Sequence, residues 1–279
     1  MKPTALMVCK GLIPPELISL LSPDDQALIA QLPPPAPFEP EHLKWDLLNH
    51  LHYSWLAPYL RTLSEGEIRN FLAVLKTDQT AGLSKVLGLG NHIPSLSKLA
   101  KGGLRKLLLE NVLQGKELVP FAFLPASPLN SLLTHTPTSF SKLIHFLGLH
   151  DLSYEMRQII DTKELKKIFA ALSKKEGEYL NTLVLHREPL VFERLFLKNW
   201  DGSKENLHKL LEERGASRLG HALYSASESL TWYITHSLDM HTGNLILKNI
   251  KKSTHARAEE LLFSQIQKIE SLLAAGGLT

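Results

Sequence analysis

The chain has 279 residues, of which 44% are hydrophobic and 21% are charged. This composition excludes an intrinsically disordered protein, which carries fewer apolar residues and a larger net charge. The formal net charge is only +3, and the one short basic stretch, at residues 248–257, contains no aromatic residue. The pattern therefore argues against a dedicated nucleic-acid-binding protein. A chain of this length has room for two or three helical subdomains.

A single cysteine, Cys9, excludes an intramolecular disulfide and a zinc site built from cysteines. Such cysteine usage is typical of the reducing cytosol. No uninterrupted apolar run approaches the ~20 residues that a transmembrane helix needs. We therefore expect a soluble, cytoplasmic protein that does not insert into the bilayer, although it could dock on a membrane-embedded partner.

The N-terminal segment carries a helix-start signal from Ser22 to Asp25. It consists of a capping serine, a proline in the first turn and two acidic residues that interact favourably with the helix dipole. The run Pro33-Pro34-Pro35-Ala36-Pro37 cannot be helical and predicts a stiff, extended linker. We expect residues 1–37 to form an N-terminal arm with its linker.

From residue 38 onward the apolar residues recur with the period of a helix. Ser64 and Glu67 have the spacing of a capping box, which predicts that a helix begins at this point. Gly88 and Gly90 close this block, and four prolines between residues 120 and 137 indicate an interdomain segment. These signals predict a helical domain over residues 38–135.

The remaining residues, 136–279, predict one helix after another, with a final helix that ends near Gly276 and Gly277. No segment shows the alternation typical of strands. Helices of this length joined by short turns stack as antiparallel pairs, in a helical bundle or an armadillo-like superhelix. We therefore expect an all-α protein of stacked antiparallel helices, with a C-terminal helical domain over residues 136–279.

One string is similar to a catalytic motif. His236, Asp239 and Asn244 resemble the H-x-D-x-x-x-x-N loop of aminoglycoside and choline kinases, in which the Asp orients the acceptor hydroxyl and the Asn holds magnesium. However, His236 is one residue too far from Asp239, and no Gly-rich phosphate loop precedes the motif. No aspartate follows Asp239 to bind the metal. A phosphotransferase is therefore an alternative interpretation and not the preferred one.

Thirteen histidines raise the question of a metal site. The closest pair, His50 and His52, is two residues apart, and such residues do not face each other on a helix. The H-E-x-x-H pattern of zinc enzymes is absent from the sequence. The sequence thus predicts no metal, no cofactor and no catalytic residue, which favours a protein that is not an enzyme.

The last third of the chain resembles the flagellar rotor protein FliG. Residues 188–195 (EPLVFERL) are similar to the FliG stretch E-M-F-x-F-E-x-L, and residues 207–213 (LHKLLEE) are similar to its I-Q-x-L-L-x-E helix. Residues 219–226 (LGHALYSA) resemble L-x-x-A-L-K-G-A, and residues 257–278 resemble the closing FliG helix. The resemblance implies that Leu190 and Phe192 are apolar contacts that join two C-terminal helical groups.

The departures from FliG concern its charged residues. Tyr224 stands at the lysine position of A-L-K-G-A, and His241 stands at the arginine of the next helix. Lys248 and Asn249 replace two adjacent acids, whereas Arg257 keeps the residue of the family. FliG generates torque through opposite charges displayed to the stator, so we expect this chain to lack that activity.

A FliG-like scaffold without motor charges implies a relative from the type III secretion injectisome. Residues 53–56 (YSWL) also resemble the SctK/YscK family of sorting-platform adaptors. The resemblance implies a non-enzymatic adaptor that links the inner-membrane ring to SctQ-type pods, and the alternative is a flagellar switch protein that contacts a FliM-like C-ring protein. The candidate partner-binding residues are Leu190, Phe192, Tyr224, His241, Lys248, Lys251, Lys252 and Arg257.

Overall fold

A computed structural model describes residues 3–34, 46–90, 92–186, 197, 200–253 and 257–278. Helices make up 70% of the protein, and the described residues form no strand. The all-α fold expected from the apolar periodicity is therefore confirmed. Within the same residues, no helix combines the length and the hydropathy that are needed to cross a membrane.

The helices divide into two compact units. The first unit comprises Met1–Asn130 together with Ser227–Met240, and the second comprises Ser131–Ala226 together with His241–Thr279. The division after residue 130 lies close to the expected boundary after residue 135. The structure differs from the expected organisation at residues 227–240, which belong to the first unit by their contacts although they lie within the C-terminal third of the sequence.

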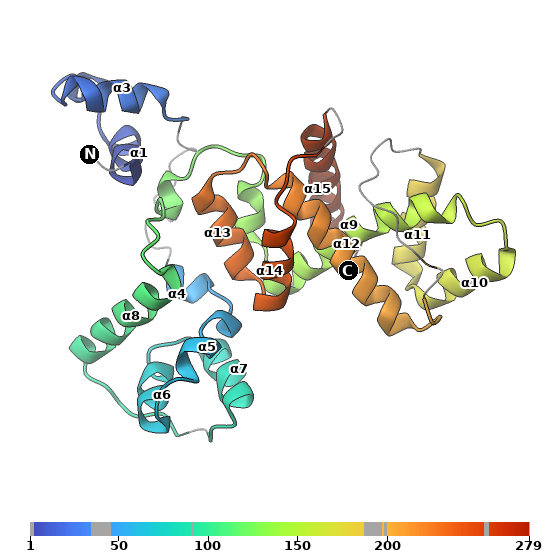
Figure 1. Ribbon diagram of the computed structural model, residues 1–279, viewed down its shortest axis with the longest axis horizontal. Helices are drawn as coiled ribbons and strands as arrows, with labels where there is room; N and C mark the ends of the chain where they lie inside the picture. The colour runs from blue at the N-terminus through green and yellow to red at the C-terminus, as the bar shows by residue number, and fades with distance from the viewer. Residues whose placement is uncertain are drawn as a thin grey trace. The chain divides into compact units, whose positions relative to one another are not determined.

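The first unit contains mostly short helices, which Figure 1 shows from blue to green, together with α13 in orange. Its helices are α1 (Pro3–Leu12), α2 (Pro15–Ile18), α3 (Pro23–Gln31), α4 (Leu47–His50), α5 (Ala57–Leu60), α6 (Glu65–Leu72), α7 (Thr77–Leu87), α8 (Lys98–Leu113) and α13 (Glu228–Ser237), with the 3-10 helices η2 (Tyr53–Trp55) and η3 (Phe121–Phe123). The 3-10 helix η4 (Asn130–Thr134) begins at the last residue of the first segment.

The helix ends of this unit follow from local sequence signals. Ser22 caps α3 by accepting a hydrogen bond from the backbone N–H of Asp25. At α6, the Ser64 N–H donates to Glu67 Oε2 at 2.8 Å, and the Ser64 hydroxyl accepts from the Glu67 N–H. Gly88 ends α7 with a φ of 68°, a conformation that glycine adopts without strain. The predicted starts of α3 and α6 and the predicted end of α7 are confirmed.

Residues 227–240 complete the first unit through contacts with its earlier residues. The Trp55 ring N–H donates to the Leu238 carbonyl at 2.9 Å, and the Tyr233 hydroxyl donates to the Val119 carbonyl at 2.8 Å. The His236 ring stacks between Trp55 and Trp232, with ring centroids 4.0 Å apart on each side. The histidine of the kinase-like string therefore has a packing role in this unit.

The second unit is built from longer helices. They are α9 (Pro137–Met156), α10 (Thr162–Ala171), α11 (Lys174–Leu185), α12 (Lys204–Ala222) and α15 (Ala258–Ala274), together with α14 (Met240–Lys248), whose first residue ends the first unit. Helices α9 and α12 contribute most of its fully buried residues.

Two glycines let α9 and α12 cross with their backbones in contact. A Cβ atom at Gly148 would lie 2.0 Å from the Leu211 carbonyl oxygen, and one at Gly215 would lie 1.7 Å from the Ile144 carbonyl oxygen. Real Cβ atoms do not approach an oxygen so closely. Ile144 thus meets Gly215, and Gly148, which comes later in α9, meets Leu211, which comes earlier in α12. The two helices therefore run in opposite directions through this crossing.

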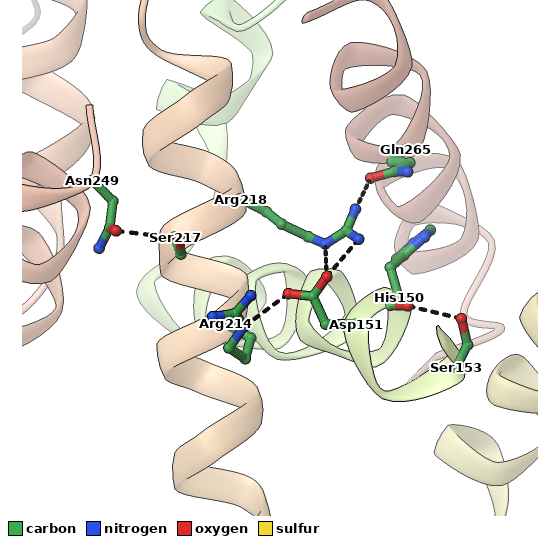
Figure 2. A network of polar contacts seen from close by, with 8 residues as sticks. All are labelled: His150, Asp151, Ser153, Arg214, Ser217, Arg218, Asn249 and Gln265. Carbon is green, nitrogen blue, oxygen red and sulfur yellow. Dashed lines mark hydrogen bonds and ion pairs between the residues drawn. The ribbon is translucent and has the colours of Figure 1, made fainter. Parts of the chain in front are cut away.

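A buried polar cluster joins α9, α12 and α15 (Figure 2). The Asp151 carboxylate accepts from Arg214 Nε at 2.9 Å and from Arg218 Nη2 at 2.7 Å. Arg218, which is 1% exposed, also donates through Nη1 to Gln265 Oε1 at 2.8 Å. A buried charge is strongly destabilising unless it is paired and hydrogen-bonded. These partners therefore allow a guanidinium group to lie inside the unit.

The crossing predicts that Gly215→Ala is strongly destabilising. The added methyl group meets backbone, which cannot rotate away, so we expect a loss of about 3 kcal/mol or more in the free energy of unfolding. Urea unfolding of the whole chain measures this loss. Gly177→Ala is the matched control, because a Cβ at this position in α11 would lie 3.6 Å from the Phe169 ring, an ordinary contact. The control should be neutral or stabilising by about 0.5–1 kcal/mol, and equal losses in both variants would contradict the tight crossing.

The stacked His236 predicts a stability that falls in mild acid. Burial lowers the pKa of His236 from 6.5 to about 4. Between these two values the unfolded chain binds a proton that the folded chain does not. The free energy of unfolding therefore decreases as the pH falls from 6.5 to 4, by at most about 1.4 kcal/mol per pH unit and less where water reaches the ring.

Urea titrations from pH 4 to 7.5, followed by tryptophan fluorescence, measure this dependence. His236→Phe keeps an aromatic ring between Trp55 and Trp232 but cannot titrate. The variant should therefore show a shallower pH dependence than the wild-type chain, and the difference isolates His236 from the other histidines. Identical slopes in the two proteins would refute this origin of the acid sensitivity.

Candidate functional site

Four of the predicted partner-binding residues lie on one edge of the second unit, which we name the basic edge. It consists of Tyr224, which follows the last turn of α12, and of Lys248, Lys251 and Lys252, which end α14 and follow it. All four residues are exposed, and Tyr224 retains 46% of its accessible surface. Three cations within five consecutive positions give this edge a positive local potential.

Contacts between α12 and the end of α14 bring these residues together. A Cβ atom at Gly220 would lie 2.8 Å from the Ile246 carbonyl oxygen and 2.8 Å from the Asn249 side chain, so the two helices approach closely. The Ser217 hydroxyl donates to Asn249 Oδ1 at 3.2 Å (Figure 2). The His221 ring donates through Nδ1 to the Lys251 carbonyl at 2.9 Å. The lysine-bearing turn is thereby fixed beside the end of α12.

Four other residues were predicted to bind partners, and the structure describes two of them. His241 is exposed in the first turn of α14, about 10 Å along the helix from Lys248. Arg257 is exposed and caps α15 with a φ of 62°, beyond a short stretch that the structure does not describe. Leu190 and Phe192 lie outside the described residues, so their assignment as apolar contacts stays a prediction.

A second group of candidate functional side chains was not predicted from the sequence. His145 from α9, Glu176 from α11 and His208 from α12 place one potential ligand atom each within 4.8 Å of one another. Glu176 Oε1 lies 2.8 Å from His145 Nε2, and Glu176 Oε2 lies 3.8 Å from His208 Nε2. The two imidazole rings lie side by side, with their centroids 4.6 Å apart.

The fold determines the position of each member of this group. With about 3.6 residues per turn, His145 and His208 lie on one side of the line of contact between α9 and α12, and Asp151 lies on the other. Glu176 is the third residue of α11, and its Oε2 accepts from the Ser173 N–H at 2.6 Å in a capping box. This hydrogen bond orients the carboxylate so that Oε1 approaches His145.

The electrostatics of the group favour an ionised carboxylate and lower the proton affinity of His208. Burial raises the pKa of Glu176, but the contact with His145 and the hydrogen bonds from Ser173 more than compensate and lower it to about 2. Burial, followed by the neighbouring His145, lowers the pKa of His208. A neutral imidazole and an ionised carboxylate are the forms in which these side chains bind metal ions.

The group opens onto a cavity of about 540 Å³. Phe146 and Leu278 supply its apolar wall, while Lys142, Lys174 and Glu212 bring charges to it. A volume of this size falls within the range of small-ligand pockets. All three members of the group are among the residues that line this cavity.

Sequence reasoning missed this group because its members are 31 and 32 positions apart, as their residue numbers show. No local spacing rule connects ligands on three separate helices. One weak signal was present: His145 stands within the apolar stretch Leu143–Leu149, where a polar residue needs a reason to be buried. Its partners become apparent once the crossing of α9 and α12 is known.

Comparisons of the chain with protein-family profiles, with curated proteins and with solved structures gave no significant match.

Proposed function

We propose that this chain is a non-enzymatic structural adaptor at the cytosolic base of a bacterial type III secretion system, where it links the inner-membrane ring to the sorting platform. The proposal starts from the resemblance of the last third of the sequence to FliG and of residues 53–56 to the SctK/YscK family. The observation that carries it furthest is the basic edge, which presents Tyr224 and three lysines to solvent. A stacked, armadillo-like arrangement of the C-terminal helices is part of the proposal.

The residues at the two positions where FliG has adjacent acids support docking rather than torque generation. Lys248 is exposed, so a cation is displayed where FliG displays an acid. Asn249 is turned toward its own unit, because its amide donates to the Leu245 carbonyl at 2.7 Å and its oxygen accepts from Ser217. Neither position offers a negative charge to a stator. Like charges placed opposite each other across an interface cost several kcal/mol, so a stator complementary to FliG would be repelled.

The same edge is complementary to an acidic partner. Its cations are exposed and adjacent, and such patches accelerate the diffusional encounter with a surface of opposite charge. Tyr224 adds a large side chain that combines an apolar ring with a hydroxyl group, a residue type enriched at interfaces. An acidic surface on the inner-membrane ring protein or on a SctQ-type pod protein fits this edge. In this proposal the adaptor is docked peripherally on the membrane-embedded apparatus.

The proposal predicts that charge reversal at the basic edge slows partner binding. In Lys248→Glu/Lys251→Glu/Lys252→Glu, the association rate constant should fall at least about tenfold at low ionic strength, because the electrostatic attraction becomes repulsion. Surface plasmon resonance with the whole chain, the cytosolic part of the ring protein and the pod protein measures this rate. The wild-type rate should also fall as salt is added.

Helix α10 offers a matched control in the same unit. Lys163, Lys166 and Lys167 are exposed and have the same spacing as the lysines of the basic edge. Lys163→Glu/Lys166→Glu/Lys167→Glu changes the net charge equally and should leave the rate nearly unchanged. Equal losses in both triple variants would show an effect of net charge alone. Salt-independent binding that survives reversal of the basic edge would refute this docking surface.

A further inference from the structure

Two buried ring nitrogens in the second unit lack hydrogen bonds. The Nε2 atoms of His145 and His208 are inaccessible to water, and neither has a hydrogen-bond partner in the described part of the chain. Although His145 Nε2 lies 2.8 Å from Glu176 Oε1, this contact does not have the geometry of a hydrogen bond. Buried polar atoms almost always have a partner. Two such atoms beside one carboxylate need an explanation.

A second histidine–glutamate pair in the same unit shows what an ordinary hydrogen-bonded arrangement looks like. His135 Nε2 also lies 2.8 Å from a carboxylate oxygen, Glu270 Oε1, and this contact has the geometry of a hydrogen bond. The other ring nitrogen of His135 contacts the Ser139 hydroxyl at 2.9 Å. The distance is the same as at His145, but at His135 both nitrogens have partners. The lack of a hydrogen bond between His145 and Glu176 is therefore not a general property of histidine–glutamate contacts in this protein.

We propose that His145, Glu176 and His208 bind a divalent transition-metal ion of the zinc class. Two imidazole nitrogens and one carboxylate oxygen are a ligand set that Zn²⁺ prefers. Bonds of about 2.0–2.1 Å in a tetrahedron place ligand atoms about 3.3 Å apart. The nearest carboxylate oxygen lies 2.8 Å from His145 Nε2 (Oε1) and 3.8 Å from His208 Nε2 (Oε2), and one ligand atom from each of the three residues lies within 4.8 Å of the others.

The surroundings of the group fit a metal with one open position. Three protein ligands leave a fourth tetrahedral position for water or an anion, and the cavity lies on this side of the group. The His208 side chain is 31% exposed although its Nε2 atom is covered, so the group lies near the surface of the unit. The ligands come from α9, α11 and α12, and a bound ion would therefore link three helices of the unit.

Zinc binding to the purified whole chain tests the proposal. Calorimetric titration with ZnCl2 should reveal one site with a dissociation constant in the micromolar range or below, and zinc should raise the melting temperature. Binding of Co²⁺ should produce the visible absorption of a tetrahedral ion, which reports the geometry of the site. Because metal-site contacts outside the ligand shell already contribute 10- to 100-fold in affinity, loss of a ligand should weaken binding at least about tenfold.

Two variants remove ligands without removing the fold. His208→Gln alters a partly exposed side chain, and Glu176→Gln retains the capping box, which accepts either Glu or Gln at this position. Both should lose the high-affinity site and the zinc-dependent rise in melting temperature. His135→Gln is the matched control and should retain both. The proposal is overturned if the wild-type chain binds no zinc at millimolar concentration, if either ligand variant binds as the wild type does, or if His135→Gln loses the site equally.

Discussion

The second unit depends on the backbone contact between α9 and α12 at Gly148 and Gly215. Without side chains at these positions, the carbonyls of Ile144 and Leu211 approach the opposite helix directly. That approach positions the side chains that the two helices bear on either side of the contact. On one side, Asp151 meets Arg214 and Arg218, and Arg218 extends the cluster to α15 through Gln265. On the other side, two histidines meet a glutamate from α11.

The sequence predicted what depends on neighbouring residues. Capping at Ser22 and Ser64, the left-handed glycine that ends α7 and the helical character of the chain were all accessible, because each is determined within a few positions. The fold class followed from the apolar periodicity.

What the sequence could not show depends on contacts between distant residues. Gly148 and Gly215 look like weak points in helices until the opposing carbonyls are known. Arg218 resembles any surface arginine, yet it is almost completely buried. Tyr224 and Lys251 are 27 positions apart in the sequence, and contacts such as the hydrogen bond between His221 and the Lys251 carbonyl reveal that their segments are adjacent. The metal-ligand group also depends on contacts between distant residues, since its members come from three helices.

The discontinuous first unit has a consequence for how the protein folds during synthesis. The chain passes between the units three times, after residues 130, 226 and 240. When a ribosome has released the first 130 residues, Trp55 still lacks the Leu238 carbonyl and the His236 ring, which emerge about a hundred residues later. Domains usually fold in order from the N-terminus as they are made. Here the N-terminal unit stays incomplete while most of the second unit is being synthesised. The apolar surface of the N-terminal unit stays uncovered until α13 has been made. The first unit is thus completed only after residue 240 has been made, and the second unit only after α15 has been made.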